Sequence, residues 1–458
     1  MKNENRLIKS LSRPECIFLI LGLAFGLILI FVTPPYQVPD ESTHFMRSYQ
    51  LSEGKILSLK RDGVVGGEIP LSILNIGTQF PVPFGADKKI SFKNIISQFS
   101  NPLEKNKTTF ASFPNTALYS PVPYLPQTIG ISIGKTLNLP IMYLFYLGRF
   151  VNLIVWLALI YCSIKMTPIL KWGFVLIALM PMTVFQAASL SADAITVGLS
   201  FLFMAIILEL LDKKNRADLR TKILIFLLAI LITLSKQTYA FIPLMFFILP
   251  RKIIGSDKEY TRTIILFILL VASSFLIWSH FVKFLYIPLQ TYVNPNDQIA
   301  YIAQHPFWYM RFILSQAMAW FSSIDSRSII GHLGWLDVPL PGWVVSSYKI
   351  ILILTFIMEA KTIKIFNFIQ RLLLGTILVL SILFIFTVMY LTWNPIGSGT
   401  IEGIQGRYFI PLLPLLFILL YSDYFKTNKR IDPKYFVPIY LLIILLETVR
   451  ILIYRYYV

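Results

Sequence analysis

Apolar runs alternate with short polar segments along most of the chain. Many of these runs reach the roughly 20 residues that an α-helix needs to cross the hydrocarbon core of a bilayer. They are expected to be helices, because a helix satisfies its own backbone hydrogen bonds inside the membrane. The pattern predicts eleven spans, at about 16–34, 141–164, 169–186, 192–211, 222–235, 237–250, 263–285, 344–360, 372–393, 407–422 and 435–454.

One apolar stretch, at 118–137, is not counted as a span. It contains Pro121, Pro123 and Pro126, and counting it would move the basic loop at 212–222 to the outer side. We expect it to form a helix that lies along the outer membrane face or dips into it.

The stretch at 222–250 leaves two interpretations open. A single long span would place Lys236 and Gln237 in mid-membrane, where a charge is costly on an isolated helix. Two short helices with Lys236 at their outer turn fit the downstream loops better.

Composition agrees with an integral membrane protein. The 458 residues are 56% hydrophobic and only 14% charged, with a mean hydropathy of +0.69. The net charge of +18 could suggest a nucleic-acid partner, but the basic residues lie in short loops between apolar runs. We therefore interpret the charge as a topology signal and expect no nucleic acid. No separate soluble domain is expected within 1–458.

The basic loops set the predicted orientation in the plasma membrane. Lys and Arg concentrate on the cytoplasmic side of membrane proteins, so the amino terminus is placed inside and the carboxyl terminus outside. Two long segments, 35–138 and 286–343, then lie outside, the first carrying helices parallel to the membrane. The basic residues placed inside are Lys2, Arg6, Lys9, Arg13, Lys165, Lys171, Lys213, Lys214, Arg216, Arg220, Lys222, Arg251, Lys252, Lys258, Arg262, Lys361, Lys364, Arg371, Lys426, Lys429, Arg430 and Lys434.

Asp40 and Glu41 follow the first span and are the candidate catalytic pair. A carboxylate can act as general base on a hydroxyl within hydrogen-bond distance. Adjacent residues in extended chain point to opposite sides, so one of the two is expected to be catalytic and the other to anchor the loop. Asp40 is slightly favoured, because Pro39 fixes the backbone before it. The alternative is a solvated acidic pair that caps a helix.

Four basic residues are candidates for binding a phosphate. Arginine offers a bidentate fork and lysine a point charge. For each of them, extension toward lipid headgroups is the alternative. They are Lys236, Arg407, Arg149 and Arg327.

Further polar residues fall at the same predicted face and are candidates for binding substrate. Asp193 could instead cap a helix, and Trp335 could stack on a sugar or join an interfacial aromatic belt. The histidines are too scattered for a metal signature, so no metal or other cofactor is expected, the alternative being a divalent ion held by Asp40, Glu41 and His44. The substrate-binding candidates are His44, Gln186, Asp193, Trp335, Asp337, Gln405 and Tyr408.

Several ordered motifs carry a resemblance to a known family. They are Val38-Pro39-Asp40-Glu41 with His44-Phe45, Gln186 to Asp193, Gly334-Trp335-Leu336-Asp337, and Gln405-Gly406-Arg407-Tyr408-Phe409-Ile410-Pro411. Over nearly its whole length the chain resembles a bacterial family of predicted polytopic membrane proteins of unknown function. That family is similar in turn to the C-type (GT-C) glycosyltransferase superfamily, whose members carry an acidic motif just after the first helix. The resemblance implies an all-α fold and a polyprenyl-phosphate sugar donor.

The function expected from this is sugar transfer, with inversion, at the outer face of the plasma membrane. Asp40 or Glu41 would deprotonate a hydroxyl of a cell-envelope glycan or lipid-linked acceptor, and the basic residues would hold the donor phosphate. A carrier or flippase for a lipid-linked saccharide, a glycan polymerase and a non-catalytic scaffold are the alternatives.

Overall fold

The computed structural model describes residues 11–81, 88–359, 366–421 and 432–458. Some residues used for the predicted orientation lie outside these ranges: Lys2, Arg6, Lys9, Lys361, Lys364, Lys426, Lys429 and Arg430.

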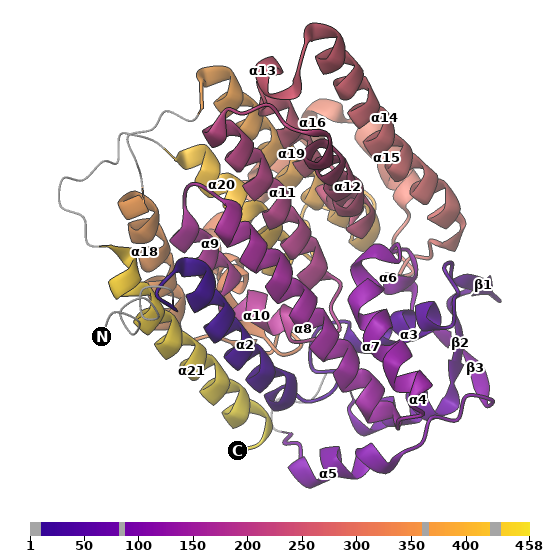
Figure 1. Ribbon diagram of the computed structural model, residues 1–458. Coiled ribbons are helices and arrows are strands. Elements are labelled where there is room, and N and C mark those ends of the chain that lie inside the picture. Colours follow the sequence, from indigo (N-terminus) through magenta and orange to yellow (C-terminus); the bar gives the residue numbers. More distant parts are fainter. Residues whose placement is uncertain (1–10, 82–87, 360–365, 422–431) are drawn as a thin grey trace, which may run out of the picture.

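The fold is a bundle of helices, as predicted (Figure 1). Within the described residues, seven helices are long and apolar enough to cross a membrane. They confirm an all-α polytopic membrane protein. Their bounds are α2 (Pro14–Val32), α8 (Ile141–Met166), α11 (Asp193–Lys213), α14 (Asp257–Val282), α18 (Gly342–Glu359), α19 (Phe368–Trp393) and α21 (Val437–Tyr456).

The other four expected spans are shorter or broken helices, so eleven single spanning helices was too simple a prediction. Proline is one physical reason: Pro181 begins a new helix, and Pro411 lies inside a 3₁₀ turn, where the missing N–H disfavours a regular α-helix. The elements are α9 (Lys171–Ala178) with α10 (Pro181–Ala187), α12 (Leu219–Ser235), η3 (Gln237–Tyr239) with η4 (Ile242–Ile248), and η7 (Gly406–Leu412) with α20 (Leu413–Leu420).

Lys236 divides the stretch at 222–250 into two elements. Its backbone is extended, with φ −156° and ψ 115°, and it ends α12. The 3₁₀ turns η3 and η4 follow, and η4 packs on α19. The two-element interpretation is therefore correct.

Successive elements run back and forth between two ends of the bundle. At one end, Glu359 accepts hydrogen bonds from the backbone of Trp172 and Gly173, Ala217 N–H donates to the Ile253 carbonyl, and Arg371 donates to the Leu419 carbonyl. This end, here called the basic end, includes the described loop residues Lys165, Lys171, Lys213, Lys214, Arg216, Arg220, Lys222, Arg251, Lys252, Lys258, Arg262, Arg371 and Lys434.

The connection between α2 and α8 is folded against the bundle. Its helix α7 packs on α8 and on α3. With 12 residues, α7 is about 18 Å long, too short to cross a bilayer, as expected for 118–137. The elements are α3 (Glu41–Ser52), β1 (Leu59–Arg61), β2 (Val64–Pro70), α4 (Leu71–Gln79), α5 (Phe92–Ser97), η1 (Gln98–Ser100), β3 (Thr108–Ser112), α6 (Pro114–Ala117), η2 (Val122–Tyr124) and α7 (Leu125–Thr136).

A small antiparallel sheet in this connection was not anticipated. Strand β2 lies between β1 and β3, and the sheet sits at one edge of the bundle (Figure 1). Gly66 permits the close pairing, since a Cβ there would lie 1.7 Å from the Ala111 carbonyl oxygen.

The connection between α14 and α18 also folds onto the bundle. Helix α16 crosses the last turns of α19, with Tyr309 Oη hydrogen-bonded to Thr387 Oγ1 and the Trp320 ring against Phe386. A two-stranded hairpin closes the connection. The elements are η5 (Lys283–Leu285), α15 (Pro295–Gln304), α16 (Pro306–Ser322), η6 (Ile324–Arg327), α17 (Ser328–Gly331), β4 (His332–Leu333) and β5 (Val338–Pro339); the remaining short elements are α13 (Arg251–Ile254) and η9 (Pro433–Tyr435).

Candidate functional site

Asp40 directly precedes α3 and has a left-handed backbone conformation, with φ 65° and ψ 8°. Non-glycine residues rarely adopt this conformation, and it persists where the surroundings hold it. Its side chain is about one-third exposed, and its Oδ1 accepts a 2.9 Å hydrogen bond from Asn115 Nδ2.

Glu41, the next residue, is completely buried. Both of its carboxylate oxygens accept hydrogen bonds from Arg149, at 2.8 and 2.6 Å. They also accept from the backbone N–H groups of Tyr36 and Leu190. Glu41 therefore fastens two loops together.

Arg149 uses all five of its N–H donors in this arrangement. Two bond Glu41, and the other three donate to the carbonyls of Ile30, Thr33 and Pro34. It is fully buried and has no donor left for a ligand. We therefore assign Arg149 a structural role and not the phosphate-binding role expected from the sequence.

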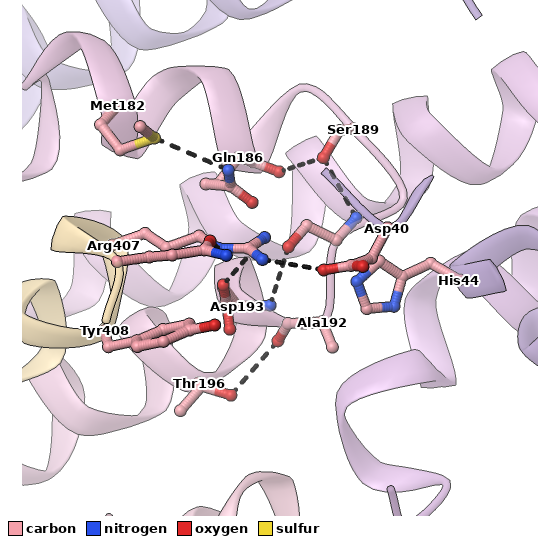
Figure 2. Close-up of polar contacts among 12 residues, drawn as sticks. Asp40, His44, Met182, Gln186, Ser189, Ala192, Asp193, Thr196, Arg407 and Tyr408 are labelled. Carbon is pink, nitrogen blue, oxygen red and sulfur yellow. Dashed lines mark hydrogen bonds and ion pairs between the residues drawn. The ribbon is translucent and has the colours of Figure 1, made fainter. Parts of the chain in front are cut away.

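Asp40 belongs to a chain of four charged residues. Arg407 Nη2 lies 2.9 Å from Asp40 Oδ2, and Arg407 Nη1 lies 3.6 Å from Asp193 Oδ2. Lys236 Nζ lies 3.3 Å from the other oxygen of Asp193. Figure 2 shows the Arg407 guanidinium between the two carboxylates. Two cations and two carboxylates thus balance one another.

Aromatic rings surround the Lys236 end of this chain. The ammonium group lies 4.4 Å from the centroid of the Tyr408 ring, and 6.0 Å from those of Tyr119 and Tyr239. Tyr239 Oη donates to the Tyr408 carbonyl. The rings provide cation–π contacts and exclude water from one side of the charge.

The surroundings lower the pKa of two cavity residues. Burial by itself would raise the pKa of Asp40, but the charges of Arg407 and His44 and hydrogen bonds from Arg407 and Asn115 bring it below its ordinary value. Burial lowers the pKa of His44 to about 4, against the attraction of Asp40. Asp40 is therefore ionised and His44 neutral near pH 7. His44 Nδ1 shares a 2.8 Å hydrogen bond with Tyr124 Oη.

A cavity of about 390 Å³ adjoins the charged residues. Its polar lining includes Asp40, His44, Asn115, Lys236 and Arg407. Its apolar lining, here called the apolar wall, comes mainly from α19, from Trp278 of α14 and from the residues that follow α14. The apolar wall consists of Leu118, Leu234, Trp278, Tyr286, Ile287, Leu289, Phe384, Ile385, Val388, Met389 and Trp393.

The alternating course of the chain explains how these residues meet. Asp40 lies in the loop after α2, Asp193 begins α11, Lys236 directly follows α12, and Arg407 is the second residue of η7. All four positions lie at the end opposite the basic end. A hydrogen bond from Trp278 Nε1 to the Leu118 carbonyl joins two of the segments that line the cavity.

The structure brings six further predicted residues to the cavity or its edge, and places others elsewhere. His44, Asp193, Lys236, Gln405, Arg407 and Tyr408 line the cavity with Asp40. Gln186 is buried in α10 and is not among the lining residues. Arg327 is exposed and also lies outside the lining.

Trp335 and Asp337 lie outside the cavity lining too, and both have partners within the fold. Trp335 Nε1 donates to the Tyr36 carbonyl at 2.8 Å. Asp337 Oδ2 accepts two hydrogen bonds from Arg455. Both side chains thus make contacts within the fold, and their candidate role in binding substrate stays a prediction.

Sequence reasoning missed Asn115 and the apolar wall. Asn115 follows Pro114 at the start of a four-residue helix, a place where asparagine commonly serves only local structure. The wall residues are indistinguishable in the sequence from those that face lipid, because both are apolar residues of hydrophobic helices.

The match to known families covers most of the chain. The family model described as predicted membrane protein (DUF2142) matches residues 23–416. The chain belongs to the DUF2142 family. All the charged residues of the cavity lie within the part that matches the DUF2142 model, whereas Arg455 lies beyond it. No curated protein and no solved structure matches the chain.

The chemistry of the lining residues suits an anionic, amphiphilic ligand. Among the described residues, no three His, Cys, Asp or Glu side chains are grouped as for a metal ion. The charges available to a ligand are the guanidinium of Arg407 and the ammonium of Lys236, next to one partly exposed carboxylate. Such a site can bind phosphate and accept a proton within the same cavity.

Proposed function

We propose that the protein is an inverting glycosyltransferase that uses a sugar linked to polyprenyl phosphate. One observation carries the proposal. A single cavity is lined by the apolar wall, a buried cation (Arg407), a largely buried cation (Lys236) and a partly exposed carboxylate, Asp40. The resemblance of its acidic motif to that of GT-C enzymes supports the same conclusion.

The apolar wall suits the lipid part of the donor. Trp278 of α14 and Phe384 and Val388 of α19 contribute to it. An isoprenoid chain that packed here would leave water, and burial of apolar surface contributes about 25 cal/mol for each Å². The head of the donor would then lie beside Lys236 and Arg407.

Lys236 and Arg407 suit the phosphate of the donor. As the sugar leaves, negative charge builds up on the phosphate oxygen that had carried it. Fixed cations next to that oxygen stabilise the charge in the transition state. Asp193 contacts both cations, and its role would be to hold them in place.

Asp40 would act as the general base. It takes the proton of the acceptor hydroxyl while the hydroxyl oxygen forms a bond to the anomeric carbon of the sugar. The bond from that carbon to the phosphate oxygen breaks, and its electron pair leaves with polyprenyl phosphate. The attack comes from the face opposite the phosphate, so the anomeric configuration inverts. Asn115, bonded to the other oxygen of Asp40, would orient the carboxylate.

The distribution of basic residues supports an active site on the outer face of the plasma membrane. The cavity lies at the end opposite the basic end. Since cytoplasmic loops are enriched in Lys and Arg, the cavity would open toward the outer leaflet. The acceptor would then be a cell-envelope glycan or a lipid-linked saccharide.

Reconstitution in lipid nanodiscs tests the proposal directly. The purified protein is supplied with polyprenyl-phosphate sugars and a panel of envelope acceptors, and products are read by mass spectrometry. A product of one added sugar, lost in Asp40→Asn, is the expected result. Ladders of longer glycans would instead indicate a polymerase. Movement of the lipid-linked sugar across proteoliposomes with no glycosyl product would indicate a carrier and contradict the proposal.

A further inference from the structure

The segment 328–337, which contains α17 and the turn of the β4–β5 hairpin, touches the backbone next to both members of the Asp40–Arg407 pair. Ser328 Oγ accepts a 3.1 Å hydrogen bond from the N–H of Gly406, the residue before Arg407. Trp335 Nε1 donates to the carbonyl of Tyr36, in the loop that leads to Asp40. One segment therefore contacts both sides of the cavity's central ion pair.

The contact beside Arg407 is close enough to require glycine. A Cβ at Gly406 would lie 2.2 Å from Ile329 N and 2.5 Å from Ser328 Oγ. Any larger residue would push η7 away from α17. The Ser328 contact therefore fixes the position of the backbone just before Arg407.

The contact beside Asp40 acts on a strained loop. Tyr36 and Asp40 both have φ of 65°, a conformation that non-glycine residues hold only when several contacts fix it. Tyr36 is held on two sides: its N–H donates to Glu41, and its carbonyl accepts from Trp335. Removal of the indole N–H of Trp335 would remove the hydrogen bond to the Tyr36 carbonyl and leave only the bond to Glu41.

The turn of the β4–β5 hairpin is held by hydrogen bonds from the end of α21. Gly334 and Leu336, on either side of Trp335, have positive φ of 61° and 62°. Asp337 accepts hydrogen bonds at 3.0 and 2.6 Å from Arg455, at the end of α21. Arg455 thereby holds the turn in the shape that aims Trp335 at Tyr36.

We propose that Trp335, with Ser328 and the Asp337–Arg455 pair, positions Asp40 against Arg407. Trp335 is a positioning residue, because it contacts the loop of Asp40 and does not line the cavity. The proposal rests on the proposed function for what Asp40 does, but the geometry that it explains can be measured without any substrate. It gives the Gly334-Trp335-Leu336-Asp337 motif a role other than sugar binding.

The test follows the titration of Asp40 in the full-length protein in nanodiscs. A carbodiimide modifies protonated carboxyl groups, and mass spectrometry of the peptide with Asp40 gives the pH of half-modification. Arg407, His44 and Tyr124 interact with Asp40, and the other charged or titratable groups of the cavity lining are Asp193, Lys236, Tyr119, Tyr286 and Tyr408. Arg407→Gln provides the largest shift, because it deletes the partner itself.

Trp335→Phe removes the indole N–H and keeps an aromatic ring. We expect it to raise the pH of half-modification by about one unit, a part of the effect that a paired arginine has on a carboxylate. The matched control is Trp343→Phe, since Trp343 is an exposed tryptophan of α18 outside the cavity. It should leave the midpoint of Asp40 unchanged.

A second variant covers the case in which Trp335→Phe does not fold. Asp337→Asn weakens the link to Arg455 without touching Tyr36, and a shift in the same direction is expected. A folded Trp335→Phe protein with the wild-type midpoint overturns the proposal. So does a wild-type midpoint in Asp337→Asn when Trp335→Phe is unfolded.

Kinetics add a second reading if the sugar transfer is found. Misplacement of the base should lower kcat in Trp335→Phe and leave the KM for the donor unchanged. The Trp343→Phe control should keep the wild-type kcat. A lower kcat in that control as well would indicate a general loss of folded protein. The carbodiimide result stands even if the protein transfers no sugar. Failure of this proposal and failure of the proposed function are therefore distinguishable.

Discussion

Two adjacent carboxylates, Asp40 and Glu41, each pair with a different arginine, and the surroundings give the two pairs different properties. Glu41 and Arg149 are both fully buried, with every guanidinium donor bonded. Asp40 is about one-third exposed to the cavity, and its partner Arg407 is shared with Asp193. The Glu41–Arg149 pair, here called the closed pair, is inaccessible to any ligand. The Asp40–Arg407 pair, here called the open pair, can exchange partners. Adjacent acidic residues can thus lie in one fully buried ion pair and in one ion pair that faces a cavity.

The largest expected effect comes from breaking the closed pair. Glu41→Gln should lower the free energy of unfolding by about 3 kcal/mol, because Arg149 would remain as a buried charge without its counter-ion. Unfolding in mixed micelles, followed by tryptophan fluorescence, measures the change. Asp40→Asn is the matched control and should cost no more than about 1 kcal/mol, as for partly exposed ion pairs. Equal losses in the two variants would remove the distinction between the pairs.

Asp40→Asn, which should cost little stability, should have a large effect on the rate of sugar transfer. Asp40→Asn should lower the rate of sugar transfer by about 100-fold or more, which is the usual contribution of a general base. The protein should still bind the donor, since Lys236 and Arg407 remain. Initial rates and donor binding in nanodiscs check both expectations. Transfer at the wild-type rate would exclude Asp40 as the base.

A smaller effect is expected for the cationic side of the open pair. Arg407→Gln should weaken binding of a polyprenyl phosphate by about 10- to 100-fold, because it removes a charge-assisted hydrogen bond to the phosphate. Arg327→Gln is the control, since Arg327 is exposed and lies outside the cavity lining. Similar binding losses in both variants would show that the phosphate does not bind beside Arg407.

The smallest effect concerns pH and tests the open pair through His44. The folded protein lowers the pKa of His44 to about 4, mainly by burial, so between pH 6.5 and 4 the unfolded chain binds a proton that the folded chain does not. Stability should therefore fall as the pH falls through this window, by at most about 1.4 kcal/mol for each pH unit. His44→Gln should remove this part of the pH dependence. An unchanged slope would contradict a neutral, buried His44.

The sequence predicted the helices well and the roles of single residues less well. Long apolar runs report spans directly, but the breaks at Pro181 and Lys236 depend on how each segment packs. Arg407 was favoured over Arg149 for binding phosphate, but both were candidates, and the sequence did not show that Arg149 is enclosed. Their partners, Glu41 and Asp40, decide which one is closed, and those contacts join residues more than 100 positions apart.

The choice between Asp40 and Glu41 was only partly predictable. The expectation that adjacent side chains point to opposite sides agrees with one facing the cavity and the other buried. Which faced which way depended on the left-handed backbone at Asp40, and aspartate only weakly signals that conformation. The small sheet was missed for a similar reason, since β1, β2 and β3 are short and β2 contains two glycines.

The end of α21 has a consequence for biosynthesis. Arg455 bonds the Lys88 carbonyl and Asp337, and Ile90 N–H donates to the Tyr456 carbonyl. The ribosome makes these partners in α21 hundreds of residues after the loop that carries Asp40. In a nascent chain Asp40 is therefore made long before α21, whose last turn bonds the segments beside the loop of Asp40, so these contacts form only after a long stretch of further synthesis.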